Sequence, residues 1–290
     1  MNLLIKLYLW LVRDRWTIGF VEEPIESIVN GKPFSIRYLS DAPKDRWYAD
    51  PFILNCDESI IELLVEEWLY KEHKGCIARL VINRVDFSII EDSVILNLDT
   101  HLSFPFIQRI NNRIYVCPEN ANSGSWTQYE YIREENRLVR VKTIVPEPLT
   151  DAVITNLFDD DLIFSTSLPK ANGSLLSVYN KEGNKIRDIK LESNVARGAG
   201  NWFKIGNRVY RPAQDCNTGY GTAVIIQEVI PESDNNFVIK DIIRIKSPHP
   251  VYSRGLHTLN SFNGLSVVDL RGYKRERLGR LTDYLKNLKK

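Results

Sequence analysis

The stretch DPFILNCDESIIELLVEE, residues 50–67, consists of an apolar segment, a short polar turn and a second apolar segment that ends in acidic residues. Two apolar runs of this length around a polar turn indicate a β-hairpin. Four further stretches follow the same plan, namely FPFIQRINNRIYVCPEN (104–120), DAVITNLFDDDLIFSTS (151–167), GAGNWFKIGNRVYRPAQD (198–215) and LHTLNSFNGLSVVDLR (256–271). The chain therefore contains five copies of one hairpin unit.

The centres of the five turns lie 47 to 57 residues apart, near residues 57, 112, 160, 207 and 264. Such a period fits one four-stranded β-propeller blade per unit. The turns are rich in Asn, Asp and Gly, which tolerate the positive φ of tight hairpins. Strand-like runs between the units, such as CIARLVINRV and TAVIIQEVIP, supply the outer strands. We therefore predict an all-β fold, a five-bladed β-propeller.

The 290 residues are predicted to form a single domain, with the propeller over residues 16–271 and a basic C-terminal helix over residues 272–290. The segment WTIGFVEE around Gly19 has strand character. We expect it to complete the last blade and close the ring, because closure removes an open sheet edge.

The C-terminal helix is predicted from four leucines at helical spacing among Lys and Arg residues, which makes the helix amphipathic. These leucines are Leu278, Leu281, Leu285 and Leu288. Packing of the helix onto the propeller is the simpler expectation. The alternative is that this helix and the apolar N-terminus form a surface patch for peripheral contact with a membrane or a partner protein.

Composition excludes several function classes. The chain has 38 Lys and Arg against 37 Asp and Glu, so it has no global field that would attract nucleic acid. The cysteines form no C-x-x-C pair, so buried free thiols are expected rather than a zinc site or a disulfide framework. They are Cys56, Cys76, Cys117 and Cys216. We predict no cofactor and no metal.

The N-terminus begins with about ten apolar residues and contains Lys6. This stretch is shorter than the ~20 residues that a membrane-spanning helix needs. It also lacks the charged n-region and the small-residue cleavage site of a secretory signal. We therefore expect a cytoplasmic protein, with peripheral attachment to the inner membrane as the alternative.

The polar ends of the strands predict a site at the central mouth of the propeller. The first strand of each blade lines the channel, and the second returns to the face where the first began. Carboxylates, amides and an arginine near tryptophans suit the hydroxyls and apolar ring faces of a sugar, although polar strand ends are also expected at any solvated rim. The residues expected at this mouth include Asp50, Glu66, Glu67, Glu119, Asn120, Asp151, Arg197, Gln214, Asp215, His257 and Asp269, with Trp47, Trp126 and Trp202 nearby.

The phrases RWYADPFI, LSFPFI, LTDAVI, ARGAGNW and YRPAQDC resemble the N-terminal domain of plant glucosamine inositolphosphorylceramide transferases and its stand-alone bacterial relatives. The resemblance runs from about Trp16 to Arg271. Nothing in the sequence resembles the separate glycosyltransferase domain of the plant proteins, so their transferase activity is not carried over. The resemblance implies a role in surface polysaccharide or glycolipid biosynthesis, together with a partner glycosyltransferase.

The five-unit layout is more distantly similar to the five-bladed glycosidases of the arabinanase, xylosidase, invertase and levansucrase group. Those enzymes use an Asp on the first blade as base or nucleophile, a second Asp, and a Glu as acid. The similarity implies these roles for Asp50 and Asp151, whereas Arg197 stands where the acid is expected. Glu119 or Glu67 is then the substitute acid, if burial keeps its carboxyl protonated.

Three functions follow from these observations. The first is carbohydrate recognition without catalysis, in which a sugar or sugar phosphate is held at the mouth. The second is a glycoside hydrolase or transglycosidase, and the third is a protein-interaction scaffold. A lone histidine is not a metal site, so His257 is expected to be hydrogen-bonded within the protein. The catalytic candidates are Asp50, Asp151 and Glu119, and the substrate-binding candidates are Glu67, Asn120, Arg197, Gln214, Asp215, His257, Trp47 and Trp202.

Overall fold

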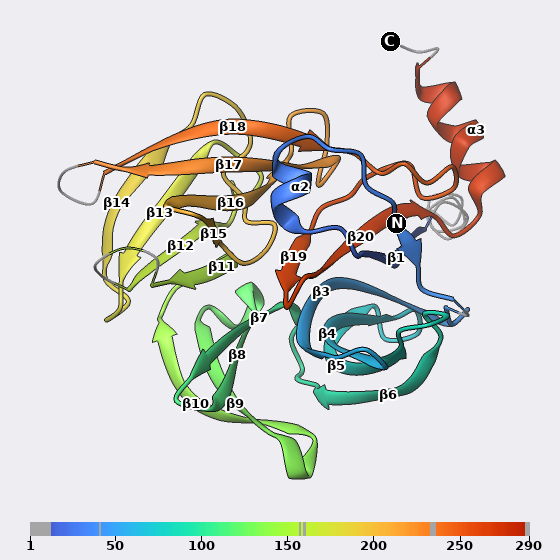
Figure 1. The fold of residues 1–290 in the computed structure, drawn as a ribbon, viewed down its shortest axis with the longest axis horizontal. Coiled ribbons are helices and arrows are strands. Elements are labelled where there is room, and N and C mark those ends of the chain that lie inside the picture. The colour runs from blue at the N-terminus through green and yellow to red at the C-terminus, as the bar shows by residue number, and fades with distance from the viewer. Residues whose placement is uncertain (1–12, 41, 157, 159–160, 233–235, 288–290) are drawn as a thin grey trace, which may run out of the picture.

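The computed structural model describes residues 13–40, 42–156, 158, 161–232 and 236–287 of the chain, and the strands of these residues form five four-stranded sheets around one axis (Figure 1). Within each sheet the strands are antiparallel, and the first strand of each unit is innermost. The predicted five-bladed β-propeller is therefore confirmed.

The first three blades each use four strands that are consecutive in the sequence. Blade one contains β3 (Arg46–Cys56), β4 (Ile60–Leu69), β5 (Lys74–Asn83) and β6 (Ile89–Leu96). Blade two contains β7 (Ser103–Ile110), β8 (Arg113–Glu119), β9 (Trp126–Ile132) and β10 (Arg137–Val145). Blade three contains β11 (Leu149–Thr155), β12 (Leu162–Ser167), β13 (Leu175–Asn180) and β14 (Lys185–Lys190).

Blade four also uses four consecutive strands, and blade five closes the ring. Blade four contains β15 (Phe203–Ile205), β16 (Arg208–Asp215), β17 (Ala223–Pro231) and β18 (Phe237–Ile245). Blade five contains β19 (Leu259–Phe262), β20 (Leu265–Tyr273), β1 (Asp14–Val21) and β2 (Arg37–Tyr38). The pairing of β1 with β20 confirms that the N-terminal strand closes the last blade. A short helix that the sequence analysis did not anticipate, α2 (Ile25–Val29), connects β1 to β2.

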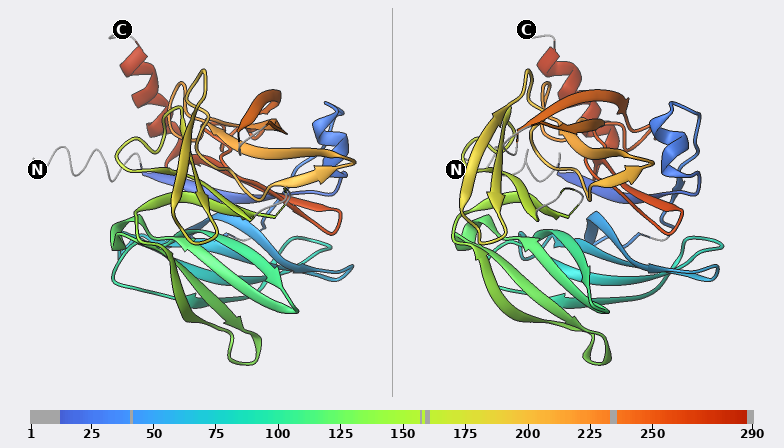
Figure 2. Two further views of the ribbon diagram at one scale, coloured as in Figure 1. Left: turned by 90° about the vertical axis from the view of Figure 1, so that its left-hand side faces the viewer. Right: turned by 60° about the vertical axis from the view of Figure 1, so that its left-hand side comes forward.

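The C-terminal helix α3 (Glu276–Asn287) extends beyond the blades (Figure 2). It begins four residues later than predicted, because Gly272 and Tyr273 still pair with Arg15 and Asp14 in the β-sheet. The apolar residues 1–12 and the last predicted helical residues, 288–290, lie outside the described part of the chain.

Three inner strands carry a β-bulge at the same position, and in each the bulged residue has a left-handed backbone. The φ angles are 50° at Asp50, 43° at Phe104 and 45° at Asp151. Bulges re-aim side chains and are frequent beside functional sites. The repeated bulge therefore gives three blades the same change of direction next to the channel.

A carboxylate from the preceding blade accepts a hydrogen bond from each bulged N–H. Asp269 accepts from the N–H of Asp50 at 2.9 Å, and Asp50 accepts from the N–H of Phe104 at 3.0 Å. Glu119 in the same way accepts from the N–H of Asp151 at 3.0 Å. These acids therefore join adjacent blades as well as facing the channel.

Apolar side chains fill the spaces between blades. The rings of Phe52 in blade one and Phe104 in blade two, for example, meet edge to face with centroids 4.9 Å apart. All four cysteines are buried and free, as predicted. Within the residues that the structure describes, no helix is long and apolar enough to cross a bilayer.

Gly200 is required where blade four meets blade five. Its φ is +150°, and an added Cβ would lie 2.1 Å from the carbonyl oxygen of Leu259. We expect Gly200→Ala to lower the free energy of unfolding by about 2–4 kcal/mol, through backbone strain and overpacking. Gly206→Ala is the matched control, because Gly206 also has a positive φ but has open space around it. Urea unfolding followed by tryptophan fluorescence measures both losses, and equal losses would contradict the steric argument.

Candidate functional site

A cavity of about 180 Å³ lies at the channel mouth, where the inner strands begin and the second strands end. Its walls come from blades one, two and five and from the loops of blade four. The lining residues are Trp16, Trp47, Asp50, Glu66, Trp68, His101, Ser103, Glu119, Arg197, Tyr220 and His257. The structure thus brings to one cavity five of the catalytic and substrate-binding candidates, namely Trp47, Asp50, Glu119, Arg197 and His257, together with Glu66, which was also expected at the mouth.

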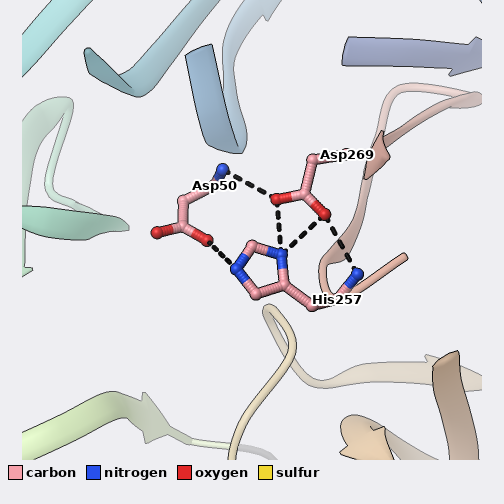
Figure 3. A group of neighbouring side chains, drawn as sticks. All are labelled: Asp50, His257 and Asp269. Atoms are coloured by element: carbon pink, nitrogen blue, oxygen red, sulfur yellow. Dashed lines mark hydrogen bonds and ion pairs between the residues drawn. The ribbon is translucent and has the colours of Figure 1, made fainter. Parts of the chain in front are cut away.

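His257 lies between two aspartates on one side of this cavity (Figure 3). Its Nδ1 is 2.7 Å from a carboxylate oxygen of Asp269, and its Nε2 is 3.4 Å from Oδ1 of Asp50. Asp269 also accepts hydrogen bonds from the backbone N–H groups of Asp50, His257 and Thr258. Asp269 therefore holds both His257 and the bulge of Asp50 in place.

The pKa values of His257, Asp269 and Asp50 each depend on the neighbouring residues of this group. Burial lowers the pKa of His257, but the negative charges of Asp269 and Asp50 outweigh that effect and leave the pKa above its ordinary value. Burial raises the pKa of Asp269, yet the charge and hydrogen bonds of His257 bring it below its ordinary value. For Asp50, burial prevails over the charge of His257, and the pKa is raised. The geometry thus fits an imidazolium held between carboxyl groups.

The same three residues have the composition of a metal site, since one ligand atom from each lies within 4.8 Å of the others. However, the Asp269 oxygens already accept N–H groups, and Nδ1 of His257 faces Asp269. A cation would displace these hydrogen bonds. The described residues therefore fit a hydrogen-bonded histidine better than a metal centre.

Arg197 neutralises the acids on the opposite side of the cavity. Its Nε is 2.5 Å from Asp151, and its Nη2 is 3.4 Å from Glu119. Gln214 donates to the same Asp151 oxygen at 2.6 Å. Asp151 and Gln214 thus lie behind Arg197 rather than in the cavity wall, so they support the site through Arg197. Burial, and then the charge of Asp151, raises the pKa of Glu119 well above its ordinary value despite Arg197.

Glu66 is the most weakly bonded acid of the cavity wall. Only 6% of it is exposed, and the nearest basic group is Nε2 of His101, 3.7 Å from its Oε1. Burial and then the charge of Asp50 raise the pKa of Glu66 well above its ordinary value. Nδ1 of His101 accepts the N–H of Gly75 at 2.8 Å, so Nε2 carries the proton in neutral His101. Glu66 is therefore a buried carboxyl group with a raised pKa beside an N–H donor.

Aromatic rings supply the apolar part of the wall. Trp16 stacks on His257 with ring centroids 4.1 Å apart, and Tyr220 meets the same imidazole edge to face at 5.2 Å. Trp47 and Trp68 stack with centroids 5.5 Å apart. The cavity wall therefore combines carboxyl groups with aromatic rings.

Four predicted substrate-binding residues lie away from this cavity. Successive residues of a strand face opposite sides, so Glu67 points away from Glu66 and pairs with Arg46. Asp215 pairs with Arg244 at 2.6 Å, while Trp202 packs on Phe164 with centroids 4.3 Å apart. Asn120 is buried beside β8 and does not line the cavity either. These four are not retained as ligand contacts.

Sequence reasoning missed several residues of the wall, because they come from outside the five repeated units or were not singled out within them. They are Trp16, Trp68, His101, Ser103 and Tyr220. One signal for Tyr220 was present in the sequence, since it lies between Gly219 and Gly221. Gly221 packs against His257, where an added Cβ would lie 2.4 Å from the Cβ of His257.

Comparison with known proteins relates residues 39–250 to the family described as glucosamine inositolphosphorylceramide transferase 1, N-terminal. The chain is 28% identical over 145 residues to glucosamine inositolphosphorylceramide transferase 1 of Arabidopsis thaliana. It is 27% identical over the same length to the protein of that name from Oryza sativa. These matches cover 44% of this chain but only 18% and 19% of the two plant proteins, respectively.

Solved structures with a similar architecture include glycosidases. A family 117 glycoside hydrolase from Zobellia galactanivorans has a TM-score of 0.51 at 10% identity, covering 82% of this chain and 91% of the hydrolase. A β-xylosidase also has a TM-score of 0.51 at 10% identity, covering 81% of this chain and 94% of the enzyme. At such low identity the likeness shows the fold alone.

Proposed function

This chain belongs to the family of the N-terminal part of glucosamine inositolphosphorylceramide transferase 1, and on that premise we propose that the propeller binds a carbohydrate in its central cavity. The observation that carries the proposal is the wall itself, in which Asp50, Glu66 and Glu119 lie among aromatic rings. Carboxyl groups accept hydrogen bonds from sugar hydroxyls, and ring faces cover the apolar C–H faces of a sugar.

The volume supports a small ligand. About 180 Å³ is less than the ~300–1,000 Å³ typical of pockets for drug-sized molecules. We therefore propose that the cavity takes one sugar ring, such as the terminal residue of a longer glycan or glycolipid, while the remainder of the ligand stays outside.

The charges favour a neutral or amino sugar over a sugar phosphate. The positive charge of Arg197 is already matched by Asp151 and Glu119, and that of His257 by Asp269. A phosphate would therefore face carboxyl groups without an unmatched cation in the wall. The oxygens of these carboxyl groups would accept hydrogen bonds from the ammonium group of a hexosamine, which suits an amino sugar.

The family relationship supports a biosynthetic role. We propose that the propeller presents a sugar or glycolipid during surface polysaccharide or glycolipid assembly on the cytoplasmic side of the membrane, in cooperation with a separate glycosyltransferase. The relatives' name refers to a glycolipid-modifying transferase, but the matched region is a minor part of those proteins.

Isothermal titration calorimetry with glucosamine, glucose and glucose 6-phosphate tests this proposal, after a glycan array has shown which linkages bind. We expect glucosamine to bind most tightly. Asp50→Asn should weaken binding about 10- to 100-fold, the value of one hydrogen bond to a charged group. Asp57→Asn is the matched control, because Asp57 lies at the far turn of the same hairpin and is exposed. Absence of binding to every sugar would refute the proposal.

A second candidate function, cleavage or transfer of a glycosidic bond, is favoured by one observation. Asp50 and Glu66, whose pKa is raised by burial, line the same cavity, which supplies the two carboxyl groups that glycoside hydrolysis needs. In this arrangement Glu66 would donate a proton to the leaving oxygen, and Asp50 would act as the base or nucleophile. Glu119 is less suited to the acid role than the sequence suggested, because Arg197 and the N–H of Asp151 already bind it.

A further inference from the structure

Over residues 276–281, the part of α3 whose side chains the structure describes, a glycine rather than a leucine is buried against the propeller. Gly279 is buried against Tyr273, and an added Cβ would lie 2.1 Å from the ring of Tyr273. Leu278 and Leu281 are 40% and 51% exposed. At about 100° per residue, these two leucines lie on one face, turned away from the side that carries Gly279. Helix α3 thus contacts the propeller, in line with the simpler expectation, but Leu278 and Leu281 on its apolar face remain exposed.

Basic residues surround the base of this helix. Nζ of Lys274 lies 3.5 Å from the ring centre of Tyr70, and Arg13 approaches the same ring. Burial, followed by the charges of Arg13, Arg15 and Arg275, lowers the pKa of Lys274, which shows that these cations lie close together. Arg277 and Arg280 are exposed on the first turns of α3.

Two acids among the described side chains of this region are already paired. Asp14 forms ion pairs with Arg254 and Arg271, and Glu276 pairs with Arg280 at 2.8 Å. Lys274, Arg277 and their neighbours thus give the base of α3 an excess of positive charge next to two exposed leucines. This combination is characteristic of helices that lie in the interface of an anionic membrane.

The position of α3 also relates it to the cavity. Trp16, which lines the cavity, pairs with Arg271 in blade five. Two residues further along, Asp14 pairs with Tyr273, and α3 begins at Glu276. The helix therefore starts beside the same mouth from which the cavity opens. Arg13, which follows the apolar N-terminal residues in the sequence, lies at this point too, since the N–H of Lys274 donates to its carbonyl oxygen.

We propose that α3 docks on an anionic lipid surface, with Leu278 and Leu281 at the headgroup boundary and the surrounding basic residues on lipid phosphates. Docking in this orientation turns the cavity mouth toward the membrane. A sugar carried by a membrane lipid would then reach the cavity without leaving the bilayer. The docking itself does not depend on sugar binding. The vesicle assay can therefore refute the docking, and calorimetry the sugar binding, independently of each other.

Co-sedimentation of the full chain with vesicles tests the docking. The vesicles contain either equal parts of phosphatidylglycerol and phosphatidylcholine or phosphatidylcholine alone, and no other protein is present. We expect binding to the anionic vesicles at low salt and its loss at high salt, because salt screens surface charge. Equal binding to both vesicle types, or none to either, would overturn the proposal.

Two variants separate the apolar and electrostatic contributions. Leu278→Glu with Leu281→Glu should lower the vesicle partition coefficient about tenfold or more, because two apolar contacts are lost. Arg277→Glu should lower it about tenfold or more at low salt, through two units of charge. The control is Val85→Glu with Ile90→Glu, which introduces the same charges at residues that are 73% and 59% exposed on blade one. An equal loss in the control would show a general charge effect and would overturn docking by α3.

Discussion

Replacement of Arg197 by methionine is expected to lower the free energy of unfolding by about 3–5 kcal/mol at neutral pH, the usual cost of leaving a buried charge without its partner. Arg197 is the cation that contacts both Asp151 and Glu119, and its side chain is 13% exposed. Methionine fills similar volume without a charge. Urea unfolding monitored by tryptophan fluorescence measures the loss.

The destabilisation by Arg197→Met should depend on pH in a defined direction. The pKa of Glu119 is already raised above its ordinary value of 4.5, and removal of the nearby positive charge raises it further. A carboxyl group with a raised folded-state pKa binds more protons when folded, so stability falls as pH increases through that range. The loss should therefore be smaller near pH 4.5 than at pH 7.5.

Arg208→Met is the matched control for this prediction. Arg208 is 70% exposed and lies 3.7 Å from Glu228, and such surface pairs contribute about 0–1 kcal/mol. Adding Glu119→Gln to Arg197→Met should recover part of the stability, because one buried acid is then removed. If Arg197→Met were no worse than Arg208→Met, the ion-pair cluster would not be what holds this side of the mouth together.

For the glycosidase candidate, Glu66→Gln is expected to lower the rate of glycoside cleavage about 100- to 10,000-fold, the range of general acid catalysis. The reduction should be large for a methyl glycoside, whose leaving alkoxide needs a proton. It should be small for a nitrophenyl glycoside, whose leaving group is already stable as an anion. Rates on both substrates, together with the Kd of the sugar by calorimetry, separate a proton-donating role from a binding role.

Glu67→Gln provides the control, because Glu67 is also buried on β4 but faces away from the cavity. Turnover by the Glu67→Gln variant should remain within about threefold of wild type if Glu66 alone donates the proton. A Glu66→Gln variant that cleaves methyl glycosides at the wild-type rate would remove Glu66 from the mechanism. Carbohydrate binding without any turnover in the wild type would leave recognition as the function of the cavity.

The fold could be predicted from sequence because its signal repeats. Each of the five units shows the same two apolar runs around a turn that favours positive φ, and their spacing fixes one blade per unit. The strand around Gly19 could be assigned to the last blade because a ring without it would leave an open edge. The start of α3 was predicted too early, since Gly272 and Tyr273 remain in the sheet through pairing with β1, a contact distant in sequence.

The site was predicted less completely, because the alternation of side chains along each strand and the β-bulges decide which side chains face the cavity. Glu66 and Glu67 are adjacent and chemically alike, and only the pleat of β4 decides which one enters the cavity. Glu66 was expected at the mouth, but Glu67 was chosen as a candidate acid. The bulges at Asp50 and Asp151 leave no clear sequence signature. His101 and Tyr220 come from loops, so the repeat gave no guide to their positions.

The pairing of the first strand, β1, with the last strand, β20, in blade five also has a consequence for biosynthesis. During translation, β1 emerges before the other strands of the propeller, but its neighbour β20 is the last of these strands. The ring can therefore shut only after the other four blades have been synthesised, and until then the edge of β1 that pairs with β20 lacks its partner and exposes its polar backbone. Exposed strand edges promote aggregation during folding. This makes the interval before closure the stage at which the nascent chain is most vulnerable.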